Sequence, residues 1–411
     1  MGQLIKKYFR GDTTIWVVFF FLVLVSAVVM YSASSYLAFR AVKHTAPIFS
    51  HITFLLAGVV VAFFIHLIPM KIIRVASYLG MALSLLLLLL IPFIGVSAND
   101  ASRWIDIMGI RFQPSEFAKL SLILVVADLI SRIKNKEDEA KYFYYILVVS
   151  GVTCFLIMIS NLSTALLLGM VIFFMMIIGN ISMRRILPPV LILMVIGILG
   201  FFVVKQIPYD AMPTVFKRSY TWVNRIDAMI LDMSSEESKF EVNDENRQTV
   251  NGRIAVARGG VFGVFPGNSV QRDYLPLAFA DCIYAIIVEE TGLIGGVFVM
   301  LLYLVLLFRS GIIANKSATV YPAVLATGLM LMIVLQALIS MAVSVGVGPV
   351  TGQPLPLISR GGTSILITCA YFGIIQCICR EQNLRKYKKE HPEEIKNDSS
   401  QTIPIISLDD M

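Results

Sequence analysis

The chain has 411 residues, of which 57% are hydrophobic and only 15% are charged, and its mean hydropathy is +0.80. A soluble domain of this length does not need so much apolar surface, whereas a protein that crosses the bilayer many times does. The net charge of +7 would suit nucleic acid, but the basic residues lie in short loops between apolar runs and at the two ends. The composition therefore indicates a polytopic membrane protein and argues against a nucleic-acid partner.

Apolar runs of about 20 residues repeat along the chain, and each is long enough to cross the hydrocarbon core as a helix. They lie near residues 13–33, 52–68, 76–97, 115–133, 142–160, 162–180, 186–204, 282–308, 319–345 and 358–379. The sequence thus predicts an all-α polytopic membrane protein with about ten transmembrane helices.

Lysines and arginines gather in every second loop, so the positive-inside rule predicts that the N- and C-termini are cytoplasmic. They follow the second, fourth, sixth, eighth and last runs, beginning at Lys71, Arg132, Arg184, Arg309 and Arg380. One large extracytoplasmic loop, about 205–281, then lies between spans 7 and 8. The predicted divisions are a cytoplasmic N-terminus at 1–12, a transmembrane domain at 13–385 and a disordered cytoplasmic tail at 386–411.

Three carboxylates, Asp281, Glu289 and Glu290, lie where the large loop meets the eighth span. A carboxylate at bilayer depth is costly, so it indicates a functional site. On a helix Glu289 would lie about 80° from Asp281 and Glu290 about 180° away, so the three cannot share one face. Asp281 is the candidate functional group, and Glu289 and Glu290 are predicted to form structural ion pairs. An alternative stays open in which Asp281 only caps the eighth span.

A second group of charges precedes and opens the fourth span. Pro114 and Glu116 form a helix-start signature, and Lys119 lies one turn deeper on the same face. With Arg103 and Arg111 in the preceding loop, they predict an electropositive pocket that suits a phosphate or pyrophosphate. A purely structural salt bridge between Glu116 and Lys119 is equally open.

The segment Gly348–Ser364 contains three prolines and four glycines between two apolar runs, so it is not expected to be regular helix. Irregular backbone at membrane depth is tolerated only where it is buried in protein or lines a cavity. Gly361 and Gly362 would present backbone N–H groups to an anion at a helix start. The alternative for this pair is a tight turn.

Taken together and in chain order, these blocks resemble the SEDS family (shape, elongation, division and sporulation) of bacterial cell-wall polymerases, over roughly residues 12–385. The matching blocks are FQPSE at Phe112–Glu116 with Lys119, Asp281 with EE-x-G at Glu289–Gly292, and PVTGQPLPLIS-x-GGTS at Pro349–Ser364. Gly267–Gln271 and Tyr31–Ser35 are more similar to the division branch than to the elongation branch.

The resemblance implies a peptidoglycan glycosyltransferase that polymerises lipid II into β-1,4-linked glycan at the outer face of the bacterial cytoplasmic membrane, for septal wall synthesis. It implies a class B penicillin-binding protein as transpeptidase partner, together with other membrane proteins of the division or elongation machinery. Asp281 would be the catalytic residue. The substrate and pyrophosphate cavity would be lined by Arg103, Glu116, Lys119, Arg258, Ser359, Gly361 and Gly362. A divalent cation, Mg²⁺ or Mn²⁺, would rest on analogy alone, because no acidic cluster with metal-ligand spacing is visible.

The chain departs from the family pattern beside its aspartate. The usual acid, His and Thr before it are here Leu277, Phe279 and Ala280, and elsewhere Asn161 and Arg360 replace an acid and a Tyr. These changes make the surroundings of Asp281 more apolar, and desolvation is expected to raise its pKa toward that of a useful general base. Two other classes stay open: a flippase for lipid-linked precursors and a non-catalytic scaffold that recruits a transpeptidase.

Overall fold

The structure is a computed structural model that describes residues 11–33, 46–98, 101–107, 110–208, 218–234, 246–275 and 278–390. Expectations for the basic segment at 1–10, for Leu277 and for the tail from 391 onward lie outside these residues. The long helices are α2 (Thr13–Ala33), α4 (Ala46–Leu67), α5 (Met70–Ile94), α6 (Pro114–Ser131), α7 (Lys136–Ser160), α8 (Leu162–Ile178), α9 (Met183–Gln206), α13 (Ile283–Lys316), α14 (Val320–Ser344) and α15 (Gly362–Glu390). Each predicted apolar run falls on one of them, which confirms the helical fold.

Eight helices in the described part of the chain are long and apolar enough to cross a membrane, so the chain is a multi-pass membrane protein. The two remaining long helices are α6 and α8. Helix α8 has only 17 residues, and α6 has 18 but carries Glu116, Lys119 and Asp128. The count of ten spans therefore stays a prediction for these two helices.

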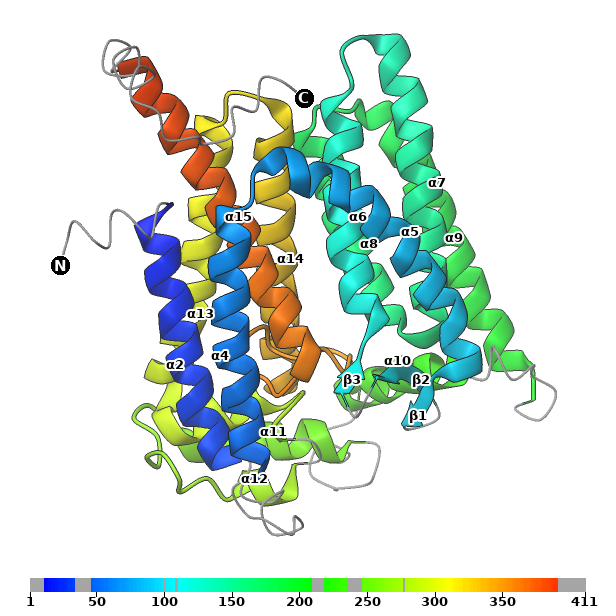
Figure 1. Cartoon of the computed structure of the whole chain (residues 1–411). Coiled ribbons are helices and arrows are strands. Elements are labelled where there is room, and N and C mark those ends of the chain that lie inside the picture. Colours follow the sequence, from blue (N-terminus) through cyan, green and yellow to red (C-terminus); the bar gives the residue numbers. More distant parts are fainter. Residues whose placement is uncertain are drawn as a thin grey trace.

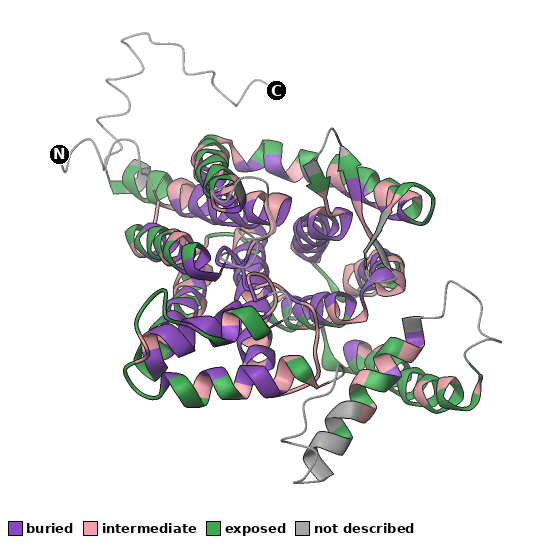
Figure 2. Ribbon diagram, turned by 90° about the horizontal axis from the view of Figure 1, so that it is seen from below, coloured by how far each residue is buried: buried purple, intermediate pink, exposed green. Residues whose placement is uncertain are grey.

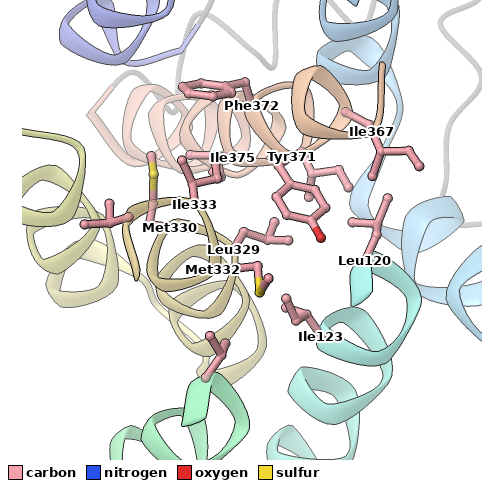
Figure 3. Close-up of a cluster of buried hydrophobic side chains, with 14 of the residues drawn as sticks. Leu120, Ile123, Leu329, Met330, Met332, Ile333, Ile367, Tyr371, Phe372 and Ile375 are labelled. Atoms are coloured by element: carbon pink, nitrogen blue, oxygen red, sulfur yellow. The ribbon is translucent and has the colours of Figure 1, made fainter. Parts of the chain in front are cut away.

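Helices α14 and α15 form the centre of the bundle. Of their most apolar stretches, 78% and 89% of the residues are buried, against 6% for α9, which lies at the edge of the bundle (Figure 1). Buried residues gather toward the centre of the bundle, and many exposed residues lie at its outer side (Figure 2). Leu329 and Ile333 of α14 pack with Phe372 and Ile375 of α15 in the shared hydrophobic core. Tyr371 of α15 points toward α6 (Figure 3). The irregular segment that joins α14 to α15 therefore begins and ends in the core of the protein.

The connections gather at opposite ends of the bundle (Figure 1). The large loop between α9 and α13 contains α10 (Arg218–Ser234), α11 (Arg247–Gly259) and α12 (Gln271–Tyr274), all at one end. The start of α2 and the last turns of α15 lie at the other end, where the Asp12 N–H donates to Gln376 Oε1 at 2.8 Å. Both ends of the helical domain therefore lie opposite the large loop, as the predicted topology requires. Which end faces the cytoplasm stays a prediction.

A small antiparallel sheet lies between α5 and α6, and the prediction of a purely helical fold missed it. Its strands, in spatial order, are β1 (Val96–Ala98), β2 (Ala101–Ile107) and β3 (Ile110–Phe112). The β-branched and aromatic residues favour strands, but the runs are too short to separate from a loop by pattern. The sheet matters because β2 carries Arg103.

Helix α13 is broken at Gly292, whose φ of 72° and ψ of −175° suit only glycine. In a continuous helix the Leu293 N–H would bond to the carbonyl of Glu289. Instead it donates to Gly260 O at 2.9 Å, and Glu289 O accepts the N–H of Val264 at 3.0 Å. One residue further along, the Ile294 N–H donates to Val261 O at 3.4 Å, and Glu290 O accepts the N–H of Phe265 at 2.9 Å.

The segment Gly260–Phe265 that follows α11 thus replaces the missing bonds of α13, and the break leaves these four backbone groups paired. The approach is so close that a Cβ on Gly263 would lie 2.2 Å from Glu290 O. Glycine is required on both sides of this junction.

Gly292→Ala is therefore expected to lower the free energy of unfolding by roughly 1–3 kcal/mol from the backbone conformation alone. Its Cβ would also lie 2.2 Å from Val261 O, which adds to the cost. Gly197→Ala in α9 is the matched control, because nothing lies within 4 Å of its Cβ. Thermal unfolding of the purified protein in detergent measures both, and equal transition temperatures for the two variants would contradict the account of the break.

Candidate active site

The segment between α14 and α15 is irregular, as predicted, and side chains from several helices hold its carbonyl oxygens. Gln336 Nε2 donates to Pro354 O at 2.9 Å, and Ser26 Oγ donates to Ile358 O at 3.1 Å. The hydroxyl of Tyr303 donates to Pro356 O. Because side chains of the neighbouring helices bond to its buried carbonyls, this irregular segment is held in one conformation.

Asp281 lies in the turn before α13, and three consecutive carbonyls at this turn are bonded to the α14–α15 region. The backbone N–H of Arg360 donates to Phe279 O at 2.9 Å, Ser359 Oγ to Ala280 O at 2.6 Å, and Ser344 Oγ to Asp281 O at 2.9 Å. The main chain that carries Asp281 is therefore held along its length. Ser359 also accepts the Leu355 N–H at 2.8 Å, so its hydroxyl serves the main chain.

Asp281 is not the cap of the eighth span. Helix α13 begins at Ile283, its N-cap position is Cys282, and the cap makes no side-chain hydrogen bond. The helical angles expected between Asp281 and the two glutamates therefore do not apply, because Asp281 precedes the helix. Within the described part of the chain, its carboxylate accepts no hydrogen bond.

Two arginines face this carboxylate without pairing with it. A Cβ on Gly352 would lie 3.6 Å from Asp281 Oδ2 and 3.9 Å from Arg103 Nη1, so the two groups meet at this glycine. The positive charge of Arg225 also lies close enough to Asp281 to lower the pKa of its carboxylate. Among the described residues neither guanidinium comes within the 4.0 Å of an ion pair to Asp281. Burial raises the pKa of Asp281, and the positive charges of Arg103 and Arg225 partly offset that rise. The direction of this shift agrees with the expectation from the apolar residues before Asp281.

Each arginine is anchored by one bond to a carbonyl. Arg103 Nε donates to Ser160 O at 3.2 Å, and Arg225 Nη1 donates to Val350 O at 2.8 Å. Burial lowers the pKa of both guanidinium groups, yet arginine stays charged at any physiological pH. A guanidinium has five N–H donors, so each can still bind an anion.

Arg225 is the site residue that the sequence did not reveal. It lies on α10, in the middle of the large loop, more than fifty residues before Asp281 in the sequence. Only the strongly amphipathic pattern of α10 and the aromatic residues beside it distinguish this arginine from the others of the loop.

Glu116 and Lys119 form a buried ion pair of 2.7 Å on α6, with the helical spacing that the sequence predicts. Lys119 Nζ also donates to Gln336 Oε1 at 3.0 Å, and Gln336 in turn holds Pro354 O. Through Gln336, the ion pair is therefore linked to the irregular segment beside Asp281. Its predicted role in binding the substrate stays a prediction.

The other predicted residues are placed as follows. Gly361 precedes α15 and accepts the N–H of Ser364 at 2.6 Å, and Gly362 is the first residue of that helix. Arg258 lies 3.4 Å from Glu289, so the structure places its guanidinium on that glutamate. The structure thus brings Asp281 together with Arg103 and the irregular segment.

The side chains around Asp281 do not fit a divalent metal ion. Over the described residues, no three His, Cys, Asp or Glu side chains are grouped to hold one. The charged neighbours of Asp281 are two cations, whereas Mg²⁺ and Mn²⁺ require several oxygen ligands.

Comparison with known sequences reveals clear relatives over most of the chain. A family model described as "Cell cycle protein" and named for FtsW, RodA and SpoVE matches residues 12–384. The probable peptidoglycan glycosyltransferase FtsW of Taylorella equigenitalis is 32% identical over 345 residues, which are 80% of this chain and 88% of the relative. The peptidoglycan glycosyltransferase MrdB of Escherichia coli is 29% identical over 297 residues, 72% of this chain and 75% of the relative.

Solved structures share the fold. A chain from a peptidoglycan synthase complex, studied for the coordination of polymerization and crosslinking, superposes with a TM-score of 0.71 at 22% identity, covering 90% of this chain and 98% of that one. The rod shape determining protein RodA of Thermus thermophilus superposes with a TM-score of 0.61 at 20% identity, covering 90% and 97%. With the family match over residues 12–384, these findings confirm the resemblance read from the motifs: the chain belongs to the SEDS family of cell cycle proteins, which includes FtsW, RodA and SpoVE.

Proposed function

We propose that this protein is a peptidoglycan glycosyltransferase that polymerises lipid II into β-1,4-linked glycan for the septal wall of a dividing cell. The observation that carries the proposal is the carboxylate of Asp281. Hydrogen bonds hold its main chain, burial raises its pKa, and two arginines that form no ion pair among the described residues lie beside it. Relatives that are about 30% identical bear the name peptidoglycan glycosyltransferase, and most of those bear the name FtsW.

In the proposed reaction Asp281 takes the proton of the acceptor sugar's 4-hydroxyl as that oxygen attacks the anomeric carbon of the donor. The new C–O bond forms while the bond from the anomeric carbon to the pyrophosphate oxygen breaks. The electron pair leaves with the lipid pyrophosphate, and the anomeric configuration inverts. The proton stays on Asp281 until solvent removes it.

Arg103 and Arg225 have the chemistry that the leaving group requires. Negative charge grows on the pyrophosphate as the bond breaks, and fixed cations in a partly buried site stabilise such charge strongly. Both guanidinium groups are held by one bond to a carbonyl, so they need little reorganisation. Their distance from Asp281 exceeds that of an ion pair, which leaves the carboxylate free to accept the proton.

The proposed site lies at the outer face of the bacterial cytoplasmic membrane. Arg74, Arg132 and Arg309 lie on the helix ends and loops opposite to the large loop, and a predominance of basic residues marks the cytoplasmic side. The proposed partner is a class B penicillin-binding protein that crosslinks the new glycan, since a structural relative comes from a complex that coordinates polymerization and crosslinking.

Asp281→Asn is expected to lower the rate of lipid II polymerisation about 10²–10⁴-fold, because an amide cannot accept the proton. The assay is the growth of fluorescent glycan from labelled lipid II by the purified protein, with and without the transpeptidase. Asp273→Asn is the control, because that aspartate is more than half exposed on the same loop. An Asp281→Asn protein that polymerises lipid II at the wild-type rate would show that Asp281 is not the catalytic base.

The pH dependence of the rate tests the role of Arg225. A base must be deprotonated, so activity falls as the pH drops through the pKa of Asp281. Arg225 lowers that pKa, so Arg225→Gln is expected to move the acidic limb of the normalised pH–rate profile to higher pH. Arg247→Gln, at an exposed arginine of α11, should leave the limb in place. A limb that stays fixed or moves to lower pH in Arg225→Gln would rule out the proposed coupling.

A further inference from the structure

Glu289 is a fully buried carboxylate in the second turn of α13, and the chain just before α12 supplies most of its partners. It accepts hydrogen bonds from the hydroxyl of Ser269, from the Val270 N–H at 3.1 Å and from the Gln271 N–H at 3.3 Å. Arg258 adds a charge contact at 3.4 Å. One side chain thus fastens the start of α12 to α13.

This attachment closes a loop that contains Asp281. The loop runs from Gln271, whose N–H bonds to the Glu289 carboxylate, through Asp281 to Glu289 in α13. Five residues of this loop form a separate small hydrophobic cluster with Ala255 of α11: Leu275, Ala278, Cys282, Ala285 and Ile286. Closing a loop at its base removes conformational freedom from every residue within it.

The turn of Asp281 therefore lies between two attachments. On one side Ser344, Ser359 and Arg360 bond to its carbonyls. On the other side Ala278 and Cys282, which flank the turn, pack in the small cluster, and Glu289 holds the chain that leads into it at Val270 and Gln271. Neither attachment touches the carboxylate, so both act on its position alone.

We propose that Glu289 is a positioning residue for Asp281: by closing the loop from Gln271 to α13, it holds the carboxylate at the distance from its substrate that the reaction needs. This inference rests on the proposed function. A misplacement of about 1 Å can lower a rate by as much as 10²-fold, so an effect at this remove from the chemistry is expected to be large.

Glu290 provides the matched control, because it is the adjacent residue, is also buried and holds different parts of the structure. It accepts from the hydroxyl of Ser32 in α2 and from the Gly267 N–H at 3.0 Å. Arg272 Nη1 donates to the same Ser32 hydroxyl at 3.1 Å. Glu290 thus ties the loop to α2. Its bond to Gly267 closes the chain outside the attachment of Glu289, so the segment that carries Asp281 stays closed by Glu289 when the bond to Gly267 is lost.

The experiment compares Glu289→Gln with Glu290→Gln in the purified full-length protein. At position 289 glutamine keeps the volume but has one acceptor oxygen in place of two and no charge, so both the attachment to residues 269–271 and the contact with Arg258 are weakened. We expect kcat for lipid II polymerisation to fall about 10–100-fold with KM unchanged, and the acidic limb of the pH–rate profile to move. Glu290→Gln is expected to lower thermal stability but to keep kcat and the limb at wild-type values.

Hydrogen exchange separates this inference from the proposed function. Amides at 278–282 should exchange faster in Glu289→Gln than in the wild type, and should be unchanged in Glu290→Gln, whether or not the protein polymerises lipid II. If the wild type fails to polymerise lipid II while this exchange pattern holds, the proposed function fails and the closed loop stands. Unchanged exchange at 278–282 in Glu289→Gln, or an equal loss of kcat in both variants, would overturn the positioning role.

Discussion

Hydrogen bonds from side chains of α2, α13 and α14 to the carbonyls of the segment between α14 and α15 make the site possible. Unpaired carbonyls beside a bilayer are costly, so irregular chain persists there only when protein donors pair with it. Ser26, Tyr303 and Gln336 supply those donors, and Ser359 extends the network to the carbonyl of Ala280. The break in α13 follows the same rule, because the segment after α11 replaces the lost helical bonds.

The electrostatics of the site follow from this framework. The nearby serine hydroxyls donate to main-chain carbonyls, so the carboxylate of Asp281 has no hydrogen-bond donor among the described residues. Burial and two arginines therefore set its pKa. These influences oppose each other: burial raises its pKa and the arginines lower it. An ion pair with either arginine would lower the pKa of Asp281 further and make it a weaker base. Because the arginines lie beyond pairing distance, Asp281 stays a useful base and their N–H groups can bind an anion.

Much of this arrangement could be predicted from the sequence, because hydropathy and glycine–proline patterns are local signals. The apolar runs and the helix start at Pro114 were predicted correctly, and the segment predicted to be irregular, Gly348–Ser364, is so up to Gly361, after which α15 begins. Contacts between distant residues were beyond such reasoning: the role of Arg225 depends on how α10 folds back, and the position of Asp281 outside α13 depends on a turn held by Ser344. Strands β1 and β3 were missed because three residues are too few to show a period.

The most direct measurement is an experimental structure of the protein with an unreactive analogue of the lipid-linked disaccharide pyrophosphate and a short glycan acceptor. The account predicts that Asp281 Oδ2 lies within hydrogen-bonding distance of the acceptor's 4-hydroxyl, with Arg103 and Arg225 on the pyrophosphate. A complex in which the pyrophosphate contacts neither arginine, or in which the reacting sugars lie away from Asp281, would contradict it.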